Sequence, residues 1–140
     1  MHMNKFRLQG HFRAAPRFSN KVPAVYLDSL RDEKDPHHLE VYLVNNTSGT
    51  LDFVASPQPL LFVSTLADAH LQDDILYFEE VLPGEAVKVA EFDEVFDSDF
   101  IHQLELFWQH REGPAKHAKI VSKGIGKIRY KVLEWLEDVE

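Results

Sequence analysis

The sequence of 140 residues contains no cysteine. This absence excludes thiol catalysis, cysteine-ligated zinc and disulfide frameworks, and it suits a reducing compartment. No apolar run is long enough to cross a bilayer, and the first 13 residues alternate basic and apolar side chains, unlike a signal peptide. We therefore expect a soluble, cytoplasmic protein. A chain of this length buries roughly two-thirds of its unfolded surface, so residues 1–140 can form one domain without a metal or disulfide.

The motifs of several enzyme classes are missing as well. There is no G-x-S-x-G sequence around any serine, and the glycines of KGIGK (123–127) lack the spacing of a phosphate-binding loop. The eight histidines do not have metal-ligand spacing, since His37 and His38 are adjacent and the pair His110 and His117 has no third ligand nearby. We expect a protein that is not an enzyme and has no cofactor. A histidine and carboxylate metal hydrolase is the enzyme-class alternative.

Charge is distributed unevenly around the net value of -8. Residues 1–30 carry five cations against Asp28 alone, whereas residues 31–114 carry eighteen carboxylates against four cations. The last 26 residues place six cations between Lys116 and Lys131 against four carboxylates. An acidic body with two basic ends can bind itself, a basic partner or a polyanion.

A period of two dominates the sequence and predicts β-strands. Apolar residues alternate with basic ones over 5–13, and three further pairs of strands are separated by turn residues. The spacing predicts hairpins of 39–43 with 51–55, of 75–81 with 86–92 across a type II turn at Pro83-Gly84, and of 104–108 with 116–121. Residues 60–66 predict a buried strand.

Two segments depart from this period. Ile128, Val132, Trp135 and Val139 are spaced by four, three and four residues, which predicts a C-terminal amphipathic helix within 124–139. Residues 14–36 are rich in proline and charge and are expected to form a loosely ordered arm or crossover. The fold class predicted is mostly β, an antiparallel β-sandwich with a short C-terminal helix.

The basic ends suggest a polyanion site. Gly124, Ile125, Gly126 and Lys127 match the hairpin of helix-hairpin-helix DNA-binding modules, although Tyr130 stands where that family has a small residue. Nucleic-acid binding through the basic segment 116–131 is therefore the alternative function. The candidate contacts for a polyanion or a partner are Arg7, Arg13, Arg17, Lys116, Lys119, Lys123, Lys127, Arg129 and Lys131.

A family resemblance rests on LEVYLVNNTSGTLDF (39–53) and LPGEAVKVAEFD (82–93). These segments resemble the uncharacterised β-sandwich domain that precedes the Smr (small MutS-related) domain in bacterial proteins. The matching positions are Val44, Asn45, Thr47, Leu51, Phe53, Pro83, Gly84, Glu91 and Phe92. The resemblance implies a non-catalytic sandwich in a cytosolic, nucleic-acid-related setting. No Smr domain follows within these residues, so no nuclease activity is carried over.

The function expected is a non-catalytic accessory module that binds a protein partner through its acidic face or an exposed edge strand. Self-association as a homodimer is included, because the basic strand at 5–13 can meet the acidic body of a second copy. In that arrangement Arg7 and Arg13 form the charge pairs between copies.

Overall fold

The computed structural model describes residues 7–8, 21–57, 61–62, 75–93, 102–122 and 130–139. At positions 61, 62, 102 and 122 it describes the backbone only. Strands make up 71% of the described residues, and the strand pairs between them are antiparallel. The predicted mostly β sandwich with a short C-terminal helix is confirmed. Among the described residues, no helix has the length and apolar character that a membrane span requires.

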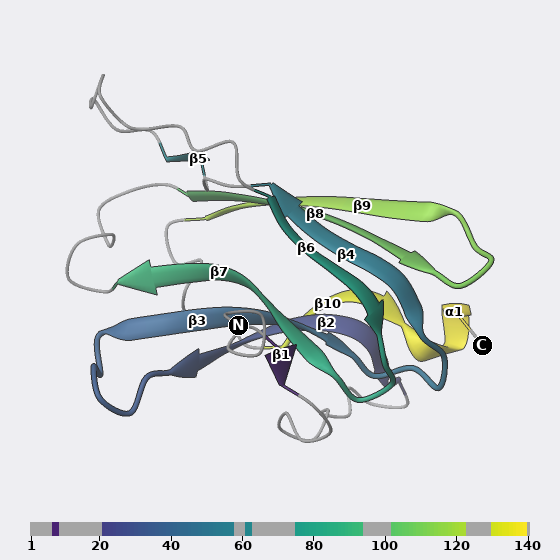
Figure 1. The fold of residues 1–140 in the computed structure, drawn as a ribbon, viewed down its shortest axis with the longest axis horizontal. Coiled ribbons are helices and arrows are strands. Elements are labelled where there is room, and N and C mark those ends of the chain that lie inside the picture. The colour runs from purple at the N-terminus through teal and green to yellow at the C-terminus, as the bar shows by residue number, and fades with distance from the viewer. Residues whose placement is uncertain are drawn as a thin grey trace.

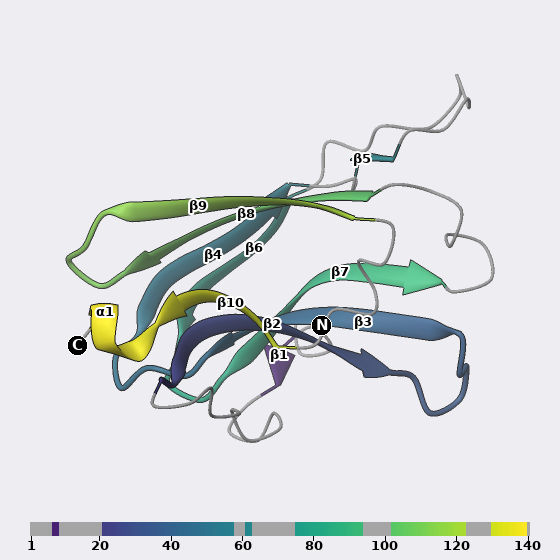
Figure 2. The ribbon, with the colours of Figure 1, turned by 180° about the vertical axis from the view of Figure 1, so that it is seen from behind.

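Two sheets lie one above the other (Figures 1 and 2). Sheet I has the strand order β1 (Arg7–Leu8), β7 (Ala86–Asp93), β3 (His38–Asn45), β2 (Pro23–Arg31) and β10 (Lys131–Trp135). Sheet II is centred on β8 (His102–His110), whose one edge pairs with β4 (Leu51–Pro57) and with β5 (Leu61–Phe62). Its other edge pairs with β9 (Ala115–Ser122), and β6 (Ile75–Val81) pairs with β4. Helix α1 (Leu136–Val139) follows β10.

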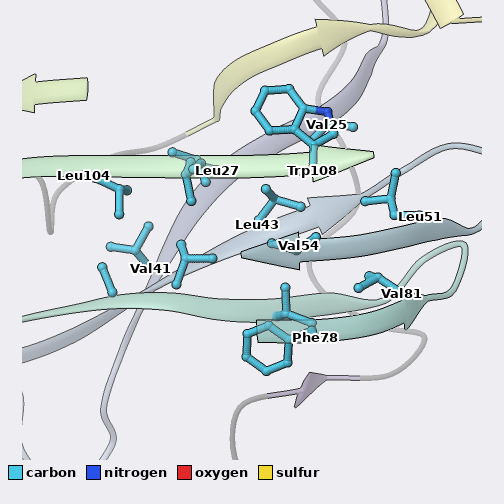
Figure 3. Packing of buried hydrophobic residues seen from close by; sticks show 14 of the residues in the cluster. Val25, Leu27, Val41, Leu43, Leu51, Val54, Phe78, Val81, Leu104 and Trp108 are labelled. Carbon is cyan, nitrogen blue, oxygen red and sulfur yellow. The ribbon is translucent and has the colours of Figure 1, made fainter. Parts of the chain in front are cut away.

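The hydrophobic core fills the space between the sheets. Val41 and Leu43 of β3 point from sheet I toward Val54 of β4 and Leu104 of β8 in sheet II (Figure 3), and all four are fully buried. Trp108 closes the same cluster on the β8 side. The alternation predicted for 39–43 and for 104–108 is therefore confirmed, since every second side chain in each strand is in the core.

Two of the three predicted hairpins are wrong. Strand β3 pairs with β2 and β7, while β4 pairs with β6 and β8, so the turn at 46–50 carries the chain from one sheet to the other. The turn between β6 and β7 does the same. It has the expected geometry, with Gly84 at a φ of 82° and Glu85 N donating to Leu82 O at 2.9 Å. Only the β8–β9 hairpin is confirmed.

Asn45 holds the two crossing turns together. Its fully buried side chain donates from Nδ2 to Val81 O at 2.9 Å and to Gly49 O at 2.9 Å. Its backbone accepts from Gly84 N at 2.7 Å. Asn45 and Gly84 are among the residues on which the family resemblance rests. Their hydrogen bonds join the two sheets at a buried corner, so both residues have a structural role.

The expectations for the two irregular segments also need correction. Within the segment read as an arm, Pro23–Arg31 is strand β2 between β3 and β10. It is buried on both faces, so its sequence lacks the alternation of a half-exposed strand. Within the predicted helix, Lys131–Trp135 is strand β10, because pairing with β2 satisfies its backbone, and only Leu136–Val139 is helical.

Several predictions lie outside the described residues. These are residues 14–20 of the predicted arm and the G-I-G junction at 124–126. The predicted first strand (5–13) is described only at β1, and the predicted buried strand (60–66) only at β5.

Candidate interaction surface

The outer face of sheet II, which we call the open face, carries apolar side chains that are exposed. Successive side chains of a strand point to opposite faces of its sheet. The side chains of this face are therefore those that point away from the core residues Val54, Phe78 and Leu106, and the strand register aligns them between neighbouring strands. Ile75, Tyr77 and Val121 are 58%, 47% and 58% exposed. The open face consists of Ile75, Tyr77, Glu79, Phe53, Ala55, Pro57, Gln103, Glu105, Phe107, Gln109, Ala115, His117, Lys119 and Val121.

One row of this face crosses all four long strands. The register aligns Tyr77 of β6, Ala55 of β4, Phe107 of β8 and His117 of β9. The rings of Phe107 and His117 are stacked with centroids 4.4 Å apart, and His117 Nε2 lies 2.8 Å from Glu105 Oε2. These contacts fix the ring of His117 against its neighbours.

Phe53 extends the aromatic surface on the β6 side. Its ring stacks on that of Tyr77 with centroids 5.8 Å apart and an interplanar angle of 21°. Two stacked ring pairs, Phe53 with Tyr77 and Phe107 with His117, therefore flank Ala55 on this face. Exposed apolar surface of this kind, bordered by polar residues, is typical of interaction sites.

Charge divides the open face into two sides. On this face β6 carries Glu79 and no cation, whereas β9 carries His117 and Lys119 and no carboxylate. Adjacent strands lie about 4.8 Å apart, so the acidic and basic edges are separated by about 14 Å. Glu79 therefore lies along one edge of the face and Lys119 along the other, with Glu105 of β8 opposite Lys119.

The outer face of sheet I, which we call the covered face, is different. Tyr26, Tyr42, Val44 and Ala86 are each at most 3% exposed on it, and they form a second buried cluster. Leu8, Leu30 and Tyr130 pack against this cluster from the described part of the chain. The central strands β2 and β3 of sheet I are therefore buried on both faces, and Tyr26 and Tyr42 are core residues.

A polar network borders the covered face. Lys88, with 6% of its side chain exposed, lies 3.1 Å from Glu40 Oε2 and 2.6 Å from Glu91 Oε2. Tyr42 donates to Glu40 Oε1 at 2.9 Å, and burial together with this carboxylate raises the pKa of the Tyr42 hydroxyl. His38 lies 3.2 Å from Glu91. The ion pairs neutralise the buried lysine, as burial requires.

The carboxylate of Glu134 connects the two sheets. Glu134 of β10 accepts from Trp108 Nε1 at 2.8 Å and lies 2.5 Å from His110 Nε2 and 3.6 Å from Lys116. Burial alone would raise the pKa of Glu134. The hydrogen bonds from Trp108 and His110 and the nearby positive charges outweigh burial, so the pKa of Glu134 is lowered. The last strand of sheet I is thereby attached to β8 and β9.

Arg7 is held within the molecule. Its guanidinium lies 3.0 Å from Glu85 Oε1, donates to Glu79 O at 2.9 Å and packs over the ring of Phe78. Glu85 is 1% exposed, and its Oε1 also accepts from Leu82 N. The charge of Arg7 is therefore matched by a buried carboxylate of the same chain.

The structure brings few of the predicted contacts together. Arg7 pairs with Glu85, Lys116 lies next to Glu134, Lys119 is on the open face, and Lys131 belongs to the other sheet. Arg13, Arg17, Lys123, Lys127 and Arg129 are outside the described residues. Within the described ranges, no three histidine or acidic side chains are arranged to hold a metal ion.

Sequence reasoning missed the open face. The available signal was Phe107, an aromatic residue at a polar position between Leu106 and Trp108. The alternation of Leu51, Phe53 and Ala55 in the sequence predicts one buried face for all three. A register shift between Leu51 and Phe53 instead turns Phe53 and Ala55 outward and Val54 inward.

No protein-family model, no curated protein and no solved structure matches this chain.

Proposed function

We propose that this chain is a non-catalytic interaction module of the cytoplasm that binds a protein partner on its open face. The observation that carries the proposal is the two ring stacks, Phe53 on Tyr77 and Phe107 on His117, on a surface that also exposes Ile75 and Val121. Aromatic rings supply much of the binding energy in protein interfaces, because they bury a large area at a small entropic cost. The resemblance to the Smr-associated sandwich and the bacterial origin that it implies stay predictions.

The placement of the described cations favours a protein over a nucleic acid. Nucleic-acid affinity comes largely from several lysines and arginines that reach phosphates on one surface. Lys119 is on the open face, where Glu79 and Glu105 are also located, whereas Arg7 is paired with Glu85. A polyanion on this face would meet carboxylates as well as cations.

Site-specific photo-crosslinking tests the proposal. Tyr77 is replaced by the crosslinker benzoylphenylalanine in cells that express the chain, and Lys131, exposed on β10, is replaced in a control. We expect protein adducts at position 77, which disappear when Phe107→Asp is added, and none at position 131. Equal labelling at both positions, or adducts removed by nuclease, would overturn the proposal.

A further inference from the structure

We propose that the corner between β6 and β7 is a binding site for the arginine side chain of an extended partner segment, and that Arg7 of β1 occupies this site as a replaceable ligand. The segment that fits has arginine followed by a large apolar residue. Four groups of β6 and of the turn that follows it form the site: the backbone carbonyls of Glu79 and Glu80, the ring of Phe78 and the carboxylate of Glu85. The site is separate from the rings of the open face and goes beyond the proposed function.

The guanidinium of Arg7 is bound from several directions. Its Nη2 donates to Glu79 O at 2.9 Å, and its Nη1 donates to Glu80 O at 3.2 Å and to Glu85 Oε1 at 3.0 Å. The guanidinium carbon lies 5.7 Å from the centroid of the Phe78 ring, within the range of a cation–π contact. A planar guanidinium reaches two carbonyls and a carboxylate at once, whereas an ammonium is a point charge. The site therefore selects arginine over lysine.

Bonds within the turn hold the site in shape. Glu85 N donates to Leu82 O at 2.9 Å, Glu85 O accepts from Asn45 N at 3.0 Å, and Leu82 N donates to Glu85 Oε1 at 2.9 Å. Glu80 has a φ of 52°, a left-handed conformation that is uncommon for a residue with a side chain and that is often found at binding sites. None of these bonds involves Arg7, so the site keeps its shape when Arg7 leaves.

Arg7 uses only part of the site. Glu85 is 1% exposed, and its Oε2 has no hydrogen-bond partner among the described residues. Arg7 contacts only the other oxygen, because its Nη2 is directed at Glu79 O. A buried carboxylate oxygen without a partner is costly, and an arginine that approaches both oxygens side by side satisfies it. A second arginine can therefore compete with Arg7 for Glu85.

Strand β1 is attached over a short length. It has two residues, which pair with β7 at Arg7↔Val87 and Leu8↔Ala86 at the edge of sheet I (Figure 1). Leu8 also packs against the cluster of the covered face. A two-residue edge strand opens at a lower free-energy cost than the central strands. An extended segment that contains arginine and a large apolar residue can then add to β7 in its place.

Titration of isotope-labelled protein with a synthetic peptide, followed by NMR, tests the site. The peptide has the sequence of residues 4–10 (NKFRLQG), and its control has citrulline, a neutral analogue, in place of the arginine. With the variant Arg7→Ala, the amide signals of Glu85, Ala86 and Val87 should shift with a dissociation constant below about 1 mM. The citrulline peptide should bind at least about tenfold more weakly. The wild-type chain should also bind the arginine peptide about tenfold more weakly than Arg7→Ala does, because its own Arg7 competes.

Two further variants control for charge and for the loss of any arginine. Glu85→Gln added to Arg7→Ala should weaken peptide binding at least about tenfold, since it removes the buried charge. Arg111→Ala removes a guanidinium that pairs with the exposed carboxylate of Asp52, and it should bind the peptide as the wild-type chain does.

The wild-type titration, carried up to about 10 mM peptide, needs no substitution and does not depend on the folding of Arg7→Ala. Equal binding of the arginine and citrulline peptides, or no shift at Glu85, Ala86 and Val87 in either protein, overturns the site. None of the substitutions removes a ring of the open face, so crosslinking at Tyr77 tests the proposed function separately.

Discussion

The covered face of sheet I and the open face of sheet II have similar residue types but opposite surroundings. Tyr26 and Tyr42 on the covered face are 1% and 3% exposed, whereas Tyr77 on the open face is 47% exposed. An outward aromatic side chain on a strand is therefore a core residue in one sheet and a surface residue in the other. The difference comes from what covers the sheet, which the strand itself does not encode.

The same substitution on the two faces should give the largest contrast. Tyr26→Ala removes a buried ring and should lower the free energy of unfolding by about 3 kcal/mol, while Tyr77→Ala should lower it by less than about 1 kcal/mol. Urea denaturation followed by circular dichroism measures both. Equal losses would show that the two faces are covered to the same extent.

The two predicted cation contacts Arg7 and Lys119 provide the next contrast. Arg7→Ala leaves the buried carboxylate of Glu85 without its cation and should cost about 2 kcal/mol of stability. Lys119→Ala should change stability by no more than about 0.5 kcal/mol, because the side chain is exposed. The measurement is again urea denaturation. A neutral Arg7→Ala would mean that this ion pair contributes little to the fold.

Substitution of Glu134 tests the contact between the sheets, and its effect on stability should depend on pH. Its pKa in the folded protein is below the ordinary value of 4.5, so its stabilising contribution is complete above that value and is lost as the pH falls through the folded pKa. Glu134→Gln should cost about 1 to 2 kcal/mol at pH 7, and less in acid. Thermal unfolding of both proteins between neutral pH and pH 3 follows this difference. A gap that widens in acid would contradict the lowered pKa.

The smallest effect on stability is expected at the edge of the open face. Ile75→Thr exchanges a side chain that is 58% exposed for a polar one of similar shape, so it should change the free energy of unfolding by less than about 0.5 kcal/mol. It should nevertheless lower the yield of protein adducts in the crosslinking experiment at position 77. A clear loss of stability would show that Ile75 is packed within its own chain.

The candidate surface could be predicted only in part. The sequence predicts Lys119 as a contact residue, but it does not predict the aromatic rings near it. In an alternating strand, Phe107 takes a position that is usually polar, and alternation alone gives it no role in binding. Phe53 was placed on the wrong face, since a bulge in pairing depends on the neighbouring strand and not on the residue itself. The cation at position 7 was expected at an interface, and its pairing with Glu85 required contact between residues 78 positions apart.

The sequence by itself determined the strands at 39–43, 75–81, 86–92 and 104–108, the type II turn at Pro83-Gly84 and the β8–β9 hairpin, because alternation and turn chemistry are local. Only the tertiary structure decided that the turns at 46–50 and 82–85 cross between sheets. It also decided that 23–31 is a central strand, and that one outer face is covered while the other is open. A turn reverses the chain whether the next strand joins the same sheet or the other one. Which sheet that strand joins depends on distant residues, because they supply its backbone hydrogen-bond partners and cover its apolar side chains.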